Sequence, residues 1–154
     1  MGFFQLPDSL STNTGSNARM GQLSAWIRGC DQNHRICRWS RKRPSTDYKW
    51  PPRRLVDLST FVDGDGSLVV RLVETATDPL PSDRRYISRS YYWGSSSTFR
   101  KLEVSSVQSL KNGWAANRLC QTFQDAFAAS TRIGVKLIWI DALCIIREEA
   151  DRDA

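Results

Sequence analysis

The sequence predicts an α/β domain with a partial parallel sheet, preceded by a β-hairpin and by a segment that contains Cys and His. Three stretches predict it: the β-prone residues Tyr86–Tyr92, the amphipathic residues Phe123–Ile133 and the apolar run "LIWI", Leu137–Ile140. A strand, a helix and a second strand in this order form a βαβ-like unit, and its two strands run parallel. Parallel strands are covered on both faces and therefore read as unbroken apolar runs.

Length and composition allow one ordinary domain. The chain has 154 residues, of which 40% are hydrophobic, and it contains six Trp, which is compatible with a folded core. Its apolar runs are far shorter than the ~20 residues of a membrane span, and its start lacks the basic and apolar regions of a secretory signal. These features predict a cytoplasmic protein without a membrane span, whose four Cys are reduced or bind a metal.

The first part of the chain divides by composition. Residues 1–20 are rich in Ser, Asn and Thr without periodicity, which predicts a flexible tail. Residues 21–53 form a Cys/His and basic segment, and nine Lys or Arg against two Asp between Arg28 and Arg54 account for the net charge of +6. The basic run is interpreted as a solvated linker; the alternative is a nucleic-acid patch in which Trp and Tyr stack on bases.

Cys30, His34 and Cys37 place three soft or borderline metal ligands within eight residues. They could hold Zn²⁺, but a structural zinc site has four ligands, and no standard finger spacing is present. The fourth ligand would have to come from Cys120, Cys144 or an acidic side chain. The alternative is a packed thiol pair beside a solvated His.

Two runs rich in Val and Leu, "RRLVDLSTF" and "SLVVRLVET", flank the turn "VDGDG". This pattern predicts a β-hairpin over residues 54–80. After it, the strand Tyr86–Tyr92 is halted by Gly94 and the polar loop "SSST". The long connection that follows holds a short predicted helix near Ser106–Lys111.

The predicted helix Phe123–Ile133 begins with a capping-box-like pair, Thr122 and Asp125, so capping is the expected role of Asp125. Gly134 can supply a left-handed cap at its end. Five residues fall on one face at helical spacing: Phe123, Ala126, Phe127, Ser130 and Ile133.

Asp141 stands at the carboxyl end of the predicted strand Leu137–Ile140, and the bend "YYWGSSS" stands at the same end of the earlier strand. In open α/β sheets ligands bind beyond these ends, so a rim site is expected where the two meet. Asp141 either contacts a ligand there or caps the next turn, and capping is favoured.

The neighbouring aromatic and thiol side chains have similar alternatives. Trp93 and Trp139 could stack on a ligand, although a buried core is the commoner fate, and Trp93 beside Gly94 is the better candidate for contact. Cys144 has no base nearby and is interpreted as a packed thiol.

Three motifs, "YISRSYYWG", "LCQTFQDAFAASTRIGVKLIWIDALCII" and "REEADRD", resemble the fungal heterokaryon-incompatibility (HET) domain in order and spacing. The resemblance covers about Tyr86 to Asp153. It matches the family pattern at Ser90, Trp93 and Gly94, then at Thr122, Phe123, Asp125 and Ala126, and finally at Trp139, Ile140, Asp141, Leu143 and Cys144. The family pattern continues past Ala154, so residues 86–154 are expected to be the N-terminal part of a truncated domain.

The resemblance implies a signalling or interaction domain in fungal non-self recognition and programmed cell death, acting through protein partners or self-assembly. Such domains are distantly similar to Toll/interleukin-1 receptor (TIR) domains, which agrees with a TIR- or flavodoxin-like parallel sheet. Some TIR-like domains hydrolyse NAD with a downstream Glu, so NAD is a cofactor only under this enzymatic alternative. Glu148 and Glu149 lie too close to the second strand to be confident substitutes, and nucleic-acid binding is the weakest hypothesis.

Overall fold

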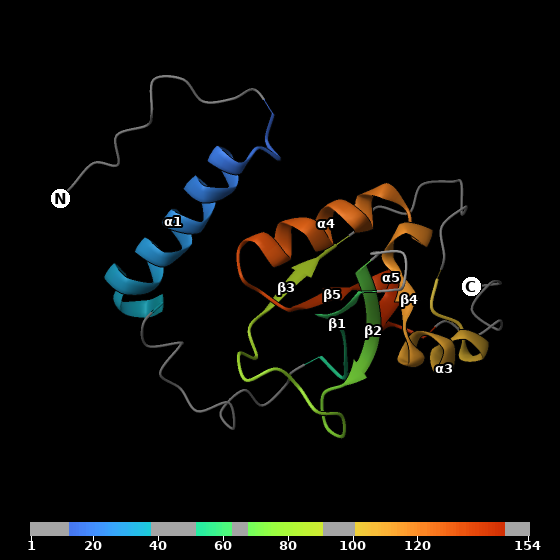
Figure 1. Ribbon diagram of the computed structural model, residues 1–154. Helices are drawn as coiled ribbons and strands as arrows, with labels where there is room; N and C mark the ends of the chain where they lie inside the picture. Colours follow the sequence, from blue (N-terminus) through green and yellow to red (C-terminus); the bar gives the residue numbers. More distant parts are fainter. Residues whose placement is uncertain (1–12, 38–51, 63–67, 91–100, 147–154) are drawn as a thin grey trace. The chain divides into compact units, whose positions relative to one another are not determined.

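The computed structural model describes residues 13–37, 52–62, 68–90 and 101–146. The chain divides into two compact units, Met1–Tyr48 and Lys49–Ala154 (Figure 1). The described part of the first unit is mainly one helix, α1 (Asn17–Asn33), which therefore begins inside the segment for which a tail was expected. Ser16 caps the helix, since its side chain accepts a hydrogen bond from the Arg19 N–H at 3.3 Å.

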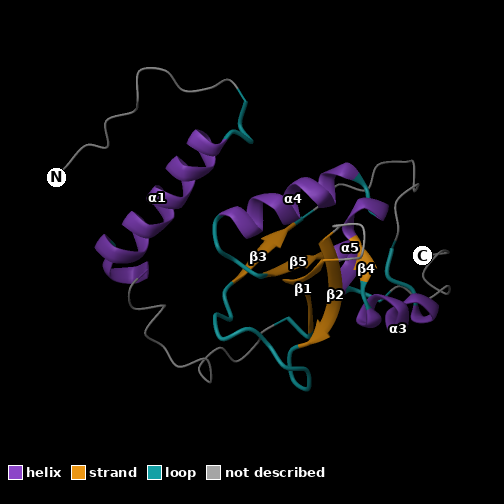
Figure 2. Ribbon diagram, viewed as in Figure 1, coloured by secondary structure: helices purple, strands orange, loops and turns teal. Residues whose placement is uncertain are grey.

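The second unit contains a five-stranded mixed sheet in the order β3-β5-β1-β2-β4 (Figure 2). Its strands are β1 (Arg54–Val62), β2 (Leu68–Glu74), β3 (Tyr86–Arg89), β4 (Trp114–Ala115) and β5 (Leu137–Ile140). Strands β3 and β5 pair in parallel, and the other pairs are antiparallel. The predicted hairpin and the predicted parallel pair are both confirmed, and together they form one sheet with β1 between β5 and β2.

Four helical elements accompany the sheet: α3 (Val104–Asn112), the 3₁₀ turn η2 (Ala116–Arg118), α4 (Gln121–Arg132) and α5 (Asp141–Cys144). Helix α3 confirms the short helix predicted near Ser106–Lys111. Strand β4 was not predicted, because two residues are too short for a periodic pattern; its pairing with β2 defines it.

Strand β5 is covered on both faces, as expected for a strand in parallel pairing, whereas the edge strand β3 alternates exposed and half-buried residues. On one face of the sheet the strands contact side chains from α3, α4 and α5. On the opposite face Leu80 packs against a smaller hydrophobic cluster. The larger cluster includes Val56, Leu58, Val70, Leu72, Leu110, Phe123, Phe127, Ile138, Ile140 and Leu143. The smaller cluster consists of Leu55, Val73 and Leu137.

The start of α4 differs from the prediction. The N-cap is Cys120, without a side-chain hydrogen bond to the helix, so the capping box of Thr122 and Asp125 is wrong. Because the helix begins at Gln121, Thr122 is already helical, and the Asp125 carboxylate instead accepts a hydrogen bond from Gln121 Nε2 at 2.8 Å. The predicted apolar face and the left-handed Gly134 (φ +79°) are confirmed.

Candidate functional site

The rim site is built on the parallel pair of β3 and β5. Tyr86 lies opposite Leu137 and Arg89 opposite Ile140, so the next residues, Ser90 and Asp141, leave the sheet at the same edge. This is the juxtaposition that the sequence predicts. Trp93 and Gly94, its other predicted members, lie outside the described residues.

Asp141 is the first residue of α5 and is half-buried. Its Oδ1 accepts a hydrogen bond from the N–H of Ala142 at 2.8 Å. A carboxylate in the first turn stabilises the start of a helix, while the N-cap position itself is occupied by Ile140. The structure thus gives Asp141 a structural contact at the rim; a second role in binding stays a prediction.

Two hydrogen bonds hold α5 in place, and neither was predicted from the sequence. The N–H of Leu102 donates to the carbonyl of Ala142 at 2.8 Å, and Arg54 Nε donates to the carbonyl of Cys144 at 2.9 Å. Arg54 comes from β1, far away in the sequence, so no local pattern could have indicated it. Both contacts fix the short helix against the edge where β3 and β5 end.

Cys144 lies beneath this rim and is only 4% exposed. Burial raises the pKa of its thiol to about 11, so it is protonated at neutral pH. A buried protonated thiol is a poor nucleophile, in agreement with the packed-thiol interpretation.

The other predicted residues are more dispersed. Trp139 is half-buried and packs against both hydrophobic clusters, so it belongs to the core rather than to an open surface. Thr122 is half-buried and Asp125 is exposed near the start of α4. Figure 1 shows α4 lying along the sheet, with its N-terminal end toward the side where β3 ends.

The first unit holds a second candidate site at the end of α1. The Cys30 sulfur lies 3.2 Å from His34 Nδ1 and 3.1 Å from the Cys37 sulfur. One ligand atom from each residue lies within 4.8 Å of the others, so the group could hold a metal ion. The side-chain hydrogen bond between Cys30 and Cys37, and after it burial, raises the pKa of the Cys30 thiol.

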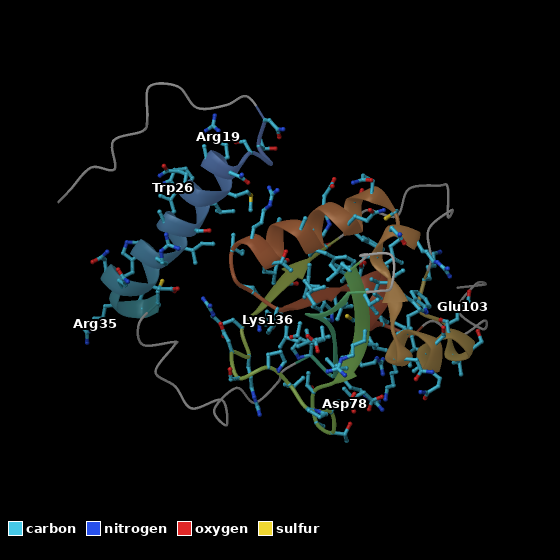
Figure 3. All side chains as sticks on the ribbon, viewed as in Figure 1. Arg19, Trp26, Arg35, Asp78, Glu103 and Lys136 are labelled. Atoms are coloured by element: carbon cyan, nitrogen blue, oxygen red, sulfur yellow. The ribbon has the colours of Figure 1, made fainter. Side chains whose placement is uncertain are left out.

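This group comprises three ligands among the residues that the structure describes. Of the fourth ligands considered from the sequence, Cys144 is buried in the core of the second unit. Arg35, labelled at this end of α1 in Figure 3, is exposed and offers no metal ligand.

The basic run Arg38–Pro44 that could contact nucleic acid lies outside the described residues, together with the aromatic residues Trp39, Tyr48 and Trp50 expected to stack on bases. The carboxylates Glu148 and Glu149 also lie outside them. Within the described part of the chain, no helix is both long and apolar enough to cross a membrane.

Comparison with protein families identifies residues 86–154 as a match to the family described as Heterokaryon incompatibility protein (HET). The matched region begins at β3 and includes α4, β5 and α5, and so contains the whole candidate rim. Comparison with curated proteins and with solved structures finds no match.

Proposed function

We infer that this chain, which carries a heterokaryon incompatibility (HET) domain over residues 86–154, acts in the cytoplasm as a signalling and interaction module of fungal non-self recognition. Engagement of the module by a protein partner, or by another copy, leads to growth arrest and programmed cell death. The observation that carries this proposal is the family match over residues 86–154.

The rim where β3 and β5 end is proposed as the contact surface. It carries an exposed hydroxyl, Ser90, and a half-buried carboxylate, Asp141, at neighbouring positions of one edge. The contacts of Leu102 and Arg54 hold α5 in place, so the Asp141 side of this edge has a fixed position. A fixed polar edge beside an apolar core is suited to a specific protein contact, since little ordering is needed on binding.

Inducible expression of the chain in fungal hyphae tests the proposal. Wild-type protein should stop growth and admit a membrane-impermeant dye, and Asp141→Asn should weaken both effects at equal levels of folded protein. Asp78→Asn is the matched control: Asp78 is also half-buried and accepts a backbone N–H, from Glu74 at 2.7 Å, but it lies outside the family match.

Two results would count against this account. Normal growth at every level of wild-type expression would contradict the signalling role. Full activity of Asp141→Asn would remove the rim as the contact surface while leaving the family role intact.

The enzymatic alternative, NAD hydrolysis by a TIR-like domain, is tested with purified protein and NAD. We expect no turnover. Turnover that disappears when Glu148→Ala and Glu149→Ala are combined would replace the interaction role with an enzymatic one.

We also propose Zn²⁺ as the ion for Cys30, His34 and Cys37. These residues offer two thiolates and an imidazole. Zinc binds such sulfur and nitrogen ligands well, whereas calcium and magnesium take oxygen ligands. Elemental analysis of the purified protein should find about one zinc per chain, and Cys30→Ser should remove it.

A further inference from the structure

Helix α1 has little of its own to keep it folded. It spans Asn17–Asn33, and none of its residues is buried. Gly21 and Gly29 lie inside it, and glycine is among the weakest helix formers. Isolated helices of about this length are marginal in water, and most helices of proteins are stabilised by a packed apolar face. Some other contribution must stabilise α1.

The C-terminal end of the helix provides one. Cys30 belongs to the last turn of α1, His34 is the C-cap residue, and Cys37 follows three residues later. The His34 N–H also donates to the carbonyl of Cys30 at 3.0 Å, so the backbone already brings these two ligands together. An ion bound to all three side chains would fasten the helix end to the segment after it.

The electrostatics of this end favour a cation. The carbonyl groups at a helix C-terminus carry partial negative charge, which Lys, Arg or His⁺ commonly offset. The last turn of α1 contains no basic side chain. Zn²⁺ at this end would bring two positive charges, which offset the two thiolates that bind it, so that neither thiolate faces the helix C-terminus uncompensated.

We propose that metal binding at Cys30, His34 and Cys37 folds helix α1: the helix is largely unfolded in the metal-free chain and forms when Zn²⁺ binds. The inference rests on the proposed zinc site. The two thiols lose their protons on binding, as zinc ligands do, and water or another small ligand takes the fourth position. The segment is then a metal-dependent module whose folding is separate from that of the sheet.

Hydrogen exchange of the full chain, resolved by peptide mass spectrometry under reducing conditions, tests this. With free Zn²⁺ at 100 times its dissociation constant, exchange in the last two turns of α1 should slow by about 100-fold relative to chelator-treated protein. Amides of β1 and β5 should not change. Metal content is measured on the same samples, so that binding and folding are read separately.

Cys30→Ser and Cys37→Ser should abolish both zinc binding and the added protection. Arg35→Gln is the matched control, because Arg35 lies between His34 and Cys37 without a metal-ligating atom, and it should retain both. Stoichiometric zinc without added protection would refute the folding inference and leave the zinc site standing. A chain that binds no zinc would refute both.

A disulfide between Cys30 and Cys37, whose sulfurs lie 3.1 Å apart, is the competing way to fasten this end. In a parallel sample without reductant, protection that persists in chelator and coincides with the loss of two hydrogens from the intact mass, with no protection gained by the reduced chain in Zn²⁺, would assign the role to that disulfide. It would overturn the metal proposal.

Discussion

The ion pair of Asp57 and Arg71 gives the sharpest test of how the sheet is held together. The two residues lie opposite each other on β1 and β2. Arg71 donates from Nε and from a terminal nitrogen to the same carboxylate oxygen, Asp57 Oδ2, at 3.1 and 3.0 Å. The Asp57 side chain is 3% exposed and that of Arg71 is 38% exposed. Arg71→Met should therefore leave a buried carboxylate without its charge partner.

The expected cost follows from this geometry. Breaking a buried ion pair from one side costs roughly 3–5 kcal/mol. Here Arg71 is partly solvated, and the Ser59 N–H still donates to Asp57 Oδ1 at 2.8 Å, so about 2–3 kcal/mol is expected. In a double-mutant cycle with Asp57→Ala, the coupling free energy should be about 1–2 kcal/mol.

Urea unfolding monitored by circular dichroism measures each free energy of unfolding. Asp83 and Arg85 provide a matched control pair, because Arg85 contacts Asp83 at 2.6 Å but both side chains are about 40% exposed, at 42% and 41%. The coupling of this exposed pair, from Asp83→Ala and Arg85→Met, should be below about 0.5–1 kcal/mol despite its shorter distance. Equal coupling in the two cycles would refute the argument that burial determines the contribution.

Three further predictions concern the second unit. Gly113→Ala should lower the free energy of unfolding by about 1–3 kcal/mol, because Gly113 has φ +115° and an added Cβ would lie 2.7 Å from Val69 Cγ1. Gly134 has φ +79° but open space around it, so Gly134→Ala should lower the free energy of unfolding by less than Gly113→Ala does. Equal losses of this free energy in urea unfolding would contradict the steric argument. The pKa of the Cys144 thiol is raised to about 11 in the folded chain, so between pH 9 and about 11 the unfolded thiol loses its proton while the folded thiol keeps it. The free energy of unfolding should therefore fall by about 2–3 kcal/mol over this pH range. Urea unfolding across this range should show a weaker fall for Cys144→Ala, and identical pH profiles would contradict the assignment. Residues 86–154 alone should show no cooperative thermal transition, because they lack β1, which pairs with both β2 and β5, whereas residues 49–154 should unfold cooperatively. Cooperative unfolding of the shorter fragment would show that the family-matched segment folds without the hairpin.

The elements with strong local patterns were predictable from the sequence. The run Leu137–Ile140 is apolar throughout because β5 is covered on both faces, and the apolar residues of α4 repeat at helical spacing because one face packs on the sheet. The parallel direction of β3 and β5 followed from the helix between them. The position of Asp141 at the rim followed from that direction.

What the sequence could not reveal depends on distant contacts. The place of β1 between β5 and β2 is fixed by pairings with β2, which follows it directly in the chain, and with β5, which comes much later. The two-residue strand β4 exists only through its pairing with β2, and the contact from Arg54 to α5 spans most of the second unit's sequence. At the start of α4 the capping pattern at Thr122 is not used, because the helix begins at Gln121, two residues before the predicted start at Phe123. Local patterns indicate where helices and strands form, whereas the partners of each strand and the exact ends of each helix depend on packing.

The parallel pairing of β3 and β5, which brings Ser90 and Asp141 to one edge, is the claim on which the rim depends. It is tested most directly by disulfide formation in chains whose native Cys are replaced. Neighbouring strands lie about 4.8 Å apart, within the range that a disulfide spans, whereas Tyr86 should lie roughly 13 Å further along the strand. Ser90→Cys with Asp141→Cys should therefore cross-link readily under mild oxidation, and Tyr86→Cys with Asp141→Cys should not. Cross-linking of the Tyr86 pair instead would mean that the strands run in opposite directions, and the rim would not exist.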